Sequence, residues 1–269
     1  MTLDELLAQA KEHSLDANKQ PTMTIPKEWG QGRTVFGGLS ASILYAAIKV
    51  KIDDDRVMRS FNCNFVGPLL VDTTFEIVVE ILRQGKNATQ ALGRIVQDGK
   101  TCVTCQVCFG VARTSKIVVK NNDTHTMEIP KKGMFLPQIP KITPKFMRFY
   151  DLSIVEGRMP FMGSKKSGIS GWMRFKKPPV EITDAHLISL IDAWPPTILQ
   201  MLRLPAPSST MSWNIEFIHP HQDFSPADWF AFKAITRQAA DGYAHTEGNV
   251  WDQSGQLIAI SRQTVGIFD

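Results

Sequence analysis

An aspartate that ends an apolar run is the first candidate for chemistry. Asp192 lies in the segment LIDAWPP, directly after Leu190 and Ile191. Helical spacing places it four residues after Ile188, so we expect the carboxylate to point inward rather than to water. Such a group needs hydrogen-bond partners, and with a bound water it could serve as a general base. The alternative is a helix cap, because Pro195 favours the first turn of a new helix.

A pair of glycines in the first half is the second candidate. Gly37 and Gly38 stand at the start of the segment GGLSASILYAAIKVK, whose apolar residues recur at helical spacing. A helix that begins with glycine presents bare N–H groups to an oxyanion and allows a substrate to approach closely. Tight packing of the helix start against a strand explains the two glycines equally well.

Cysteine, histidine and basic residues give weaker signals. In CVTCQVC, strand alternation turns Cys105 away from Cys102 and Cys108, which favours packed free thiols over a zinc site. His186 is expected to face solvent, and the segment HPH at 219–221 lies in a turn without further metal ligands, so no metal is expected. The basic residues that could meet the phosphates of a ligand, or form a solvated face, are Lys165, Lys166, Arg174, Lys176 and Lys177.

Several enzyme classes lack their signatures in this chain. There is no Gly-x-Ser-x-Gly segment, so a serine esterase would lack its nucleophile turn. A P-loop and the glycine fingerprint of dinucleotide-binding folds are missing as well. A water-activating carboxylate therefore stays the leading chemical hypothesis.

The elements that must position these residues occur in a repeated order. In the first half a helix at 34–51 is followed by strands at 57–66, 73–83, 88–97 and 101–113. In the second half a helix at 184–202 is followed by strands at 209–220 and 228–238 and by a hairpin at 243–268.

The two halves also share their turn and strand-end residues. Gly99 and Gly255 are 156 positions apart (255 − 99), and the same shift relates Gly110 to Gly266 (266 − 110). The segment FVGP at 65–68 likewise corresponds to FIHP at 217–220. Turn and strand-end residues that recur in the same order indicate an internal repeat.

The repeat predicts an α+β fold of two tandem units. Each unit is a helix wrapped by an antiparallel sheet, and the two sheets are expected to join into one, which is a double hot-dog arrangement. The expected boundaries are 1–115 for the N-terminal hot-dog, 116–168 for a linker and 169–269 for the C-terminal hot-dog. The linker contains Pro130, Pro137, Pro140, Pro144 and Pro160.

These segments resemble the type II acyl-CoA thioesterases, the TesB-like family. The resemblance is carried by VFGGLSASILYAA and RSFNCNFVGPL in the first half, and by LISLIDAWPP and WDQSGQLIAISRQTVGIF in the second. It implies that Asp192, Thr210 and Gln263 hold the hydrolytic water, with Ser209 or Ser212 replacing Thr210 if the strand register differs. The segment DAWPP departs from the Ser-Asp pair of the best-known members, which suggests a divergent branch.

The resemblance implies hydrolysis of an acyl-CoA to a free acid and coenzyme A, without a cofactor. Two other functions are compatible with the chain: a hot-dog dehydratase or hydratase acting on acyl-CoA, and a non-catalytic acyl-CoA binding protein. The first usually needs a histidine beside the acid, and none lies next to Asp192 in sequence, although His186 is near.

Composition limits the partners. The 269 residues are 43% hydrophobic, and 30 basic against 26 acidic residues give a net charge of +4, too little to imply nucleic acid. The chain has no apolar run of about 20 residues, and its acidic first segment is unlike a signal peptide, which predicts a cytoplasmic protein without a membrane partner. A homodimer of double hot-dogs is a further expectation.

Overall fold

The computed structural model describes residues 1–15, 22–131, 139 and 143–268. Two of the linker prolines, Pro137 and Pro140, lie outside these residues. The chain divides into two compact units: 1–118, 144–146 and 179–189 form the first, and 119–143, 147–178 and 190–269 form the second. Each unit is described by itself below.

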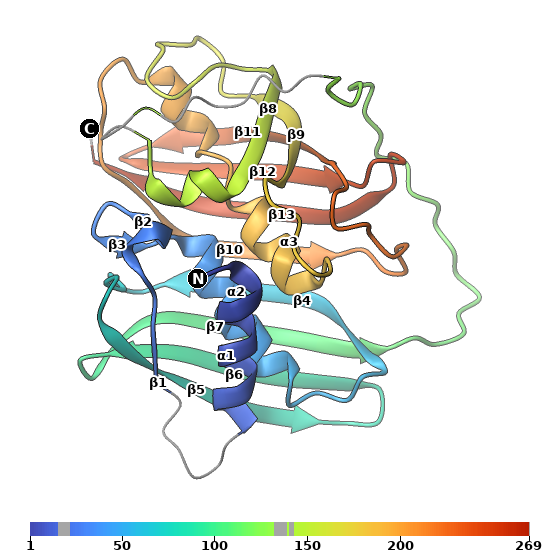
Figure 1. Cartoon of the computed structure of the whole chain (residues 1–269). Helices are drawn as coiled ribbons and strands as arrows, with labels where there is room; N and C mark the ends of the chain where they lie inside the picture. The colour runs from blue at the N-terminus through green and yellow to red at the C-terminus, as the bar shows by residue number, and fades with distance from the viewer. Residues whose placement is uncertain (16–21, 132–138, 140–142, 269) are drawn as a thin grey trace. The chain divides into compact units, whose positions relative to one another are not determined.

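The first unit is an antiparallel sheet covered by two helices (Figure 1). The sheet has the order β1-β5-β6-β7-β4. Its strands are β1 (Thr22–Thr24), β4 (Arg56–Phe65), β5 (Thr74–Gln84), β6 (Ala88–Gln97) and β7 (Lys100–Val111). Two short strands, β2 (Gly30–Gln31) and β3 (Thr34–Val35), form a separate pair after the 3₁₀-helix η1 (Lys27–Trp29).

Helix α2 (Gly37–Lys49) is the central helix of this unit. It packs against β6 and β7, and α1 (Leu3–Leu15) packs on it. Its residues from Gly38 to Ile48 are all buried, as expected for a helix that is apolar on nearly every side. Helix α1 was not predicted, although Leu3, Leu6, Leu7 and Ala10 follow helical spacing and are buried.

The second unit is an antiparallel sheet of the order β10-β13-β12-β11-β9-β8. Its strands are β8 (Tyr150–Glu156), β9 (Ile169–Phe175), β10 (Ser208–Phe217), β11 (Phe230–Ala240), β12 (Tyr243–Trp251) and β13 (Leu257–Ile267). The 3₁₀-helix η3 (Thr197–Met201) also belongs to this unit, whereas the 3₁₀-helix η2 (Lys145–Phe149) and the helix α3 (Asp184–Ile191) have residues in both units. The six strands account for most of the buried apolar residues of this unit.

Two sequence expectations are wrong here. The connection at 116–168 is not irregular throughout, because it contains η2 and the strand β8, which pairs antiparallel with β9. The helix expected at 184–202 ends at Ile191, and residues 192–196 form a turn, a bend and an irregular stretch before η3. Two consecutive prolines, Pro195 and Pro196, explain the break, since proline supplies no N–H to a helix interior.

The repeated turn residues occupy equivalent places in the two sheets. Gly99 lies in the β6–β7 turn and Gly255 in the β12–β13 turn, and both have positive φ angles, of 71° and 86°. Glycine adopts this backbone region without steric cost. Gly110 and Gly266 are each the second-last residue of the closing strand, which confirms the predicted correspondence.

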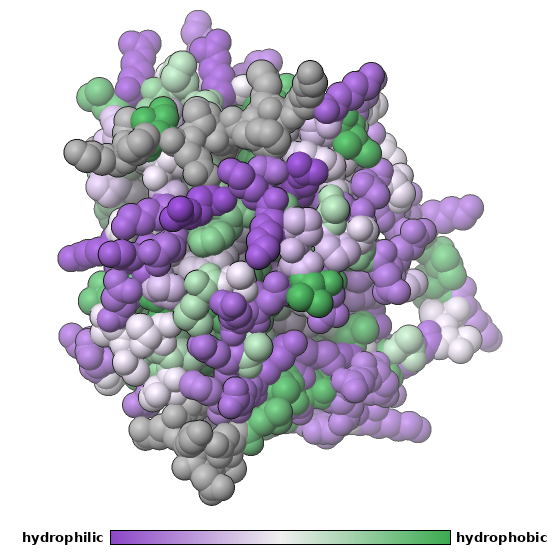
Figure 2. All heavy atoms as spheres, in the orientation of Figure 1, coloured by the Kyte–Doolittle hydropathy of each residue, from purple (hydrophilic) through white to green (hydrophobic). Residues whose placement is uncertain are grey.

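No helix among the described residues is long and apolar enough to cross a membrane. Hydrophilic side chains cover much of the face seen in Figure 2, with hydrophobic ones scattered between them. Such scattered exposure is normal for a folded protein surface.

Candidate functional site

The structure brings Asp192 and Gln263 into direct contact. Gln263 Nε2, on β13, donates a hydrogen bond to Asp192 Oδ1 at 2.9 Å, across 71 positions of sequence. Asp192 is the first residue after α3 and is half-buried, as is Gln263. An amide N–H that bonds to the carboxylate fixes its orientation and satisfies one of its lone-pair sites.

The helix-cap interpretation of Asp192 does not hold for the next helix. The N-cap residue of η3 is Pro196, and no side chain caps that helix. The carboxylate instead faces the β13 amide, so the segment LIDAWPP turns a charged group toward the sheet. The hydrogen bond to Gln263 is the partner that a half-buried carboxylate needs.

The strand register shows which hydroxyl shares a face with Gln263. Trp213 lies directly opposite Gln263, and Thr210 lies opposite Val265, so Thr210 is on the same face of the sheet as Gln263. A β-bulge between Thr210 and Ser212 pairs Ser212 with Thr264, on the other face. Among the described residues, no hydrogen bond joins the Thr210 hydroxyl to Asp192 or Gln263.

A small cavity borders Gln263 on this face. Its volume is about 20 Å³, and its walls include Gln263, Thr246 and Ser261 from the sheet and Trp194 from the turn after α3. The indole of Trp194 stacks on Phe232, with 5.1 Å between ring centroids and 9° between planes. Trp194 Nε1 also donates to Met173 Sδ at 3.1 Å, so the side chain that covers the cavity is held on both sides.

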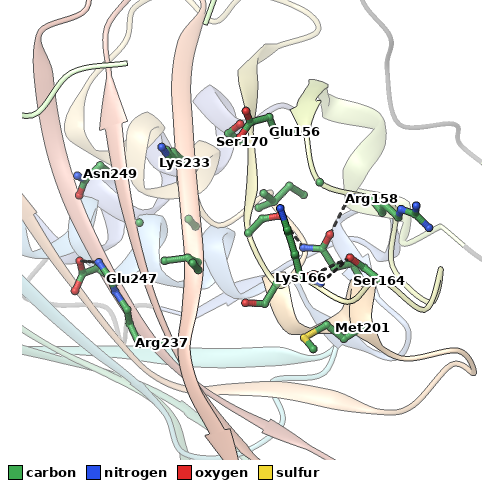
Figure 3. Close-up of a pocket in the computed structure, with 18 of the residues that line it drawn as sticks. Glu156, Arg158, Ser164, Lys166, Ser170, Met201, Lys233, Arg237, Glu247 and Asn249 are labelled. Atoms are coloured by element: carbon green, nitrogen blue, oxygen red, sulfur yellow. Dashed lines mark hydrogen bonds and ion pairs between the residues drawn. The ribbon is translucent and has the colours of Figure 1, made fainter. Parts of the chain in front are cut away.

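A much larger and more open pocket of about 1,340 Å³ lies at the end of β9 and beside β11 (Figure 3). Five basic and three acidic side chains line it: Arg158, Lys165, Lys166, Lys233 and Arg237, with Asp123, Glu156 and Glu247. Ala234 and Gly248 line both this pocket and the small cavity. The excess of basic groups favours an anionic ligand.

The basic residues singled out in sequence separate into two groups. Lys165 and Lys166 line the large pocket, whereas Arg174 lies over the Trp229 ring, 4.3 Å from its centroid, and is paired with Asp151 at 3.2 Å. Lys176 and Lys177 do not line this pocket. Within the pocket, hydrogen bonding from Arg237 is the main cause that lowers the pKa of Glu247, and Arg262 contributes less.

Gly37 and Gly38 are the first two residues of α2, as predicted. The N-cap residue is Phe36, which supplies no side-chain hydrogen bond. The first N–H groups of an α-helix have no intrahelical acceptor, so those at the start of α2 can donate hydrogen bonds to a carbonyl oxygen. Ser40 and Ser42 bond back to the carbonyls of Gly37 and Gly38, at 2.9 and 2.7 Å, and hold the first turn closed.

His186 is not solvent-facing as expected. Only 3% of it is exposed, and its Nε2 lies 3.1 Å from Asp4 Oδ1 while Nδ1 lies 2.8 Å from Thr183 Oγ1. Burial lowers the pKa of His186, and the hydrogen bond with Asp4 opposes this only in part. The residue therefore ties the start of α3 to α1 and has a structural explanation.

This histidine predicts that the first unit loses stability in acid. Because the folded pKa lies below the unfolded value of about 6.5, the unfolded chain binds the proton more readily. The contribution of the neutral His186 to the stability of the first unit is complete above pH 6.5 and is lost as the pH falls below it. Thermal melts between pH 8 and pH 5 should show a fall in Tm that is smaller in His186→Gln. An equal fall in both proteins would assign the effect to other groups.

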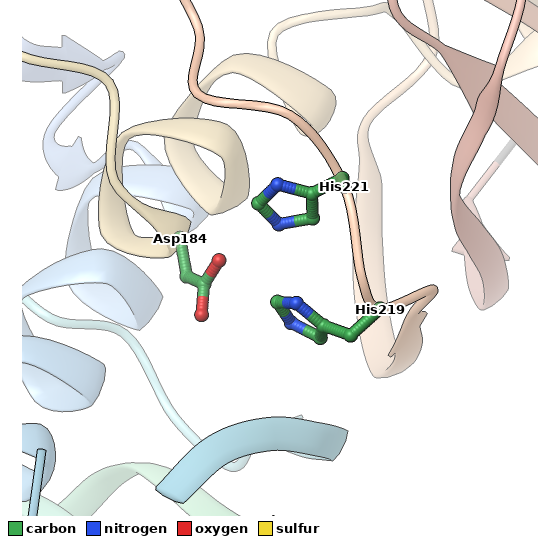
Figure 4. A group of neighbouring side chains, drawn as sticks. All are labelled: Asp184, His219 and His221. Carbon is green, nitrogen blue, oxygen red and sulfur yellow. The ribbon is translucent and has the colours of Figure 1, made fainter. Parts of the chain in front are cut away.

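The remaining predicted features are placed as follows. The rings of His219 and His221 lie side by side on the segment after β10, with centroids 4.5 Å apart (Figure 4).

All four cysteines are free thiols, and Cys105 and Cys108 face opposite sides of β7, as the alternation predicted. Burial raises the pKa of the Cys105 thiol well above its ordinary value, which fits a packed rather than a reactive cysteine.

The first unit thus joins an antiparallel sheet to the helices α1 and α2, and the second unit has an antiparallel sheet and a carboxylate–amide pair beside a cavity. Family models match both halves: the acyl-CoA thioesterase N-terminal domain at residues 25–110 and the C-terminal domain at 124–267. The fold and these family matches define a thioester hydrolase of the double hot-dog class. The chain belongs to the acyl-CoA thioesterase family.

Individual relatives agree with this assignment. Acyl-CoA thioesterase 2 of Haemophilus influenzae is 25% identical, and the match covers 86% of each chain. A hot-dog protein of unknown function from Alicyclobacillus acidocaldarius has a TM-score of 0.79 at 20% identity, covering 97% of this chain and 98% of that one. The acyl-CoA thioesterase II TesB2 of Mycobacterium marinum gives 0.71 at 17%, with the same coverage. These structures confirm the double hot-dog fold.

Sequence reasoning missed two groups of the cavity. Thr246 and Ser261 line it together with Gln263, and neither was singled out. Ser261 lies two positions before Gln263 and so shares its face of β13, a signal that was present in the sequence. Thr246 gave no such signal, because only the pairing of β12 with β13 places it opposite Gln263.

Proposed function

We propose that the chain hydrolyses acyl-CoA by means of a water that Asp192 activates. The observation that supports this most directly is the 2.9 Å hydrogen bond from Gln263 Nε2 to Asp192 Oδ1, beside the cavity under Trp194. The amide orients the carboxylate, which can then polarise a water. Thr210, on the same face as Gln263, is the hydroxyl that we assign to this water.

The proposed reaction forms one C–O bond and breaks one C–S bond. Asp192 takes a proton from the water, whose oxygen attacks the thioester carbonyl carbon and forms the new C–O bond. The C–S bond then breaks, and the coenzyme A thiolate leaves and takes up the proton from Asp192. The products are a free acid and coenzyme A, so no redox partner is needed.

The carbonyl oxygen gains negative charge during the attack, and N–H donors would stabilise it. We assign Gly37 and Gly38 to this contact, because the start of α2 leaves its first N–H groups without intrahelical acceptors. Lys165 and Lys166 are assigned to the phosphates of the coenzyme, because the large pocket that they line carries more basic than acidic groups. A homodimer and a cytoplasmic location stay predictions.

A coenzyme A release assay on a panel of acyl-CoAs tests the proposal. Short, long, branched and aromatic acyl-CoAs are incubated with the protein, and the free thiol is measured with a chromogenic disulfide. We expect thiol release with at least one substrate at a rate proportional to protein. An acyl-CoA dehydratase or hydratase would instead change the absorbance of an enoyl-CoA without thiol release, and a binding protein would show binding alone. Either result contradicts the proposal.

A further inference from the structure

The structure points to one more residue of the hydrolytic site. We infer that Thr246 holds a water against Gln263 and so positions the amide that orients Asp192. This inference rests on the proposed function and adds to it a group that neither the family models nor the sequence motifs name. Four observations support it, each on a different property of the cavity.

The first observation is strand register. Thr246 on β12 lies directly opposite Gln263 on β13, so both side chains stand on the same face of the sheet. Directly opposed residues of an antiparallel pair have Cβ atoms about 4.5–5.5 Å apart, which is the span that one water can bridge between two polar side chains. Gln263 in turn bonds to Asp192.

The second observation is an unused hydrogen-bonding group. Thr246 Oγ1 is shielded from solvent and has no hydrogen-bond partner among the described residues. A buried hydroxyl without a partner is costly, so it is expected to carry a function or to bind a water. The neighbouring threonine on β11 behaves differently: Thr236, directly opposite Thr246, shares a 2.8 Å hydrogen bond with Thr197.

The third observation is the size of the cavity. At about 20 Å³ it exceeds the roughly 10–15 Å³ needed for one water. A water bound there would contact the Gln263 amide, which orients Asp192. Catalysis falls steeply when a reacting group is misplaced.

The fourth observation is the chemistry of the cavity wall. Apart from Gln263, Thr246 and Ser261, the sheet contributes Phe232, Ala234 and Gly248, which offer no polar side-chain atom. Ser261 Oγ already accepts a hydrogen bond from Trp213 Nε1 at 2.9 Å. Thr246 is therefore the hydroxyl on this part of the sheet that has both its donor and its acceptor capacity available.

The test uses Thr246→Val, which removes the hydroxyl and keeps the branched shape. We expect kcat on the best acyl-CoA to fall about 10-fold to 100-fold, with KM changed little, since the Gln263 amide and the Asp192 carboxylate are misplaced while the substrate still binds. The Tm should stay the same or rise, because the valine carries no unpaired hydroxyl. Thr246→Ser keeps a hydroxyl and should restore kcat to within a few-fold of the wild type.

Thr236→Val is the matched control, one strand away in the same row. It breaks the Thr236–Thr197 hydrogen bond, so it should lower the Tm and leave kcat nearly unchanged. A structural role for Thr246 predicts the same pattern for Thr246→Val. A fall in kcat without a fall in Tm separates the positioning role from the structural one.

Two results would overturn the inference. The first is Thr246→Val with wild-type kcat while Asp192→Asn is inactive, which rejects Thr246 and leaves the proposed function intact. The second comes from a high-resolution crystal structure of the wild-type protein in which no water lies within hydrogen-bond distance of Thr246 Oγ1. The crystal structure tests the position of the water even if the wild type releases no coenzyme A. An absence of coenzyme A release would contradict the proposed function instead.

Discussion

Asp192→Asn should lower kcat on the best acyl-CoA by a factor on the order of 10² to 10⁴. The amide keeps the shape of the carboxylate but cannot take a proton from water. The Gln263 Nε2 donor can still bond to the asparagine Oδ1, so the contact with β13 is kept. The measurement is steady-state thiol release together with a thermal melt.

Asp252→Asn is the matched control for this change. Asp252 is 5% exposed and its Oδ1 accepts from the backbone N–H groups of Ser254 and Gln256, at 2.9 and 3.0 Å, in the turn between β12 and β13. Its asparagine variant should lose stability and keep kcat. Full turnover of Asp192→Asn would show that the general base is another residue, and a fall in Tm like that of Asp252→Asn would make Asp192 structural.

Gly171→Ala should strongly destabilise the second unit. Gly171 is on β9, between β8 and the Trp194 indole, and an added Cβ would lie 2.0 Å from the Ser153 carbonyl oxygen and 2.8 Å from the Trp194 ring. Real Cβ atoms do not approach a backbone oxygen this closely, so the β8–β9 pairing must shift. We expect a loss of about 3 kcal/mol in the free energy of unfolding, or roughly 6–12 °C in Tm.

The same change should reduce activity in the molecules that stay folded, since Trp194 forms one wall of the cavity beside Gln263. Gly168→Ala is the control: its added Cβ would meet only the Ala234 carbonyl oxygen, at an ordinary 3.9 Å. Differential scanning calorimetry of both variants compares them. Equal melting temperatures for Gly171→Ala and the wild type would show that β8 moves aside without cost.

Two residues of the site could be predicted from the sequence by the position of their motifs. Asp192 and Gln263 were named together because their segments resemble a family pattern, and the structure gives them a shared hydrogen bond. The choice among Thr210, Ser209 and Ser212 could not be made in the same way. A β-bulge at Thr210/Ser212 changes which side chains share a face, and a one-residue irregularity of this kind leaves no mark in an alternating pattern.

Elements that depend on distant partners also could not be predicted from the sequence. The strand β8 carries no turn signal and follows a proline-containing stretch, so it was assigned to a linker; only its pairing with β9 makes it a strand. The early end of α3 at Ile191 is a local effect of Pro195 and Pro196 that the apolar run obscured. His186 was taken for a surface residue because its partner, Asp4, is 182 positions away.

The sequence by itself determined the repeat, the β6–β7 and β12–β13 hairpins and the glycine turns at Gly99 and Gly255, because these follow from local periodicity and backbone sterics. The tertiary structure alone decided that Thr246 lies opposite Gln263, with its hydroxyl unpaired beside a small cavity. The physical reason is that alternation assigns a side chain to a face, whereas its neighbour across the sheet is set by the register of two strands, which depends on packing of the whole unit.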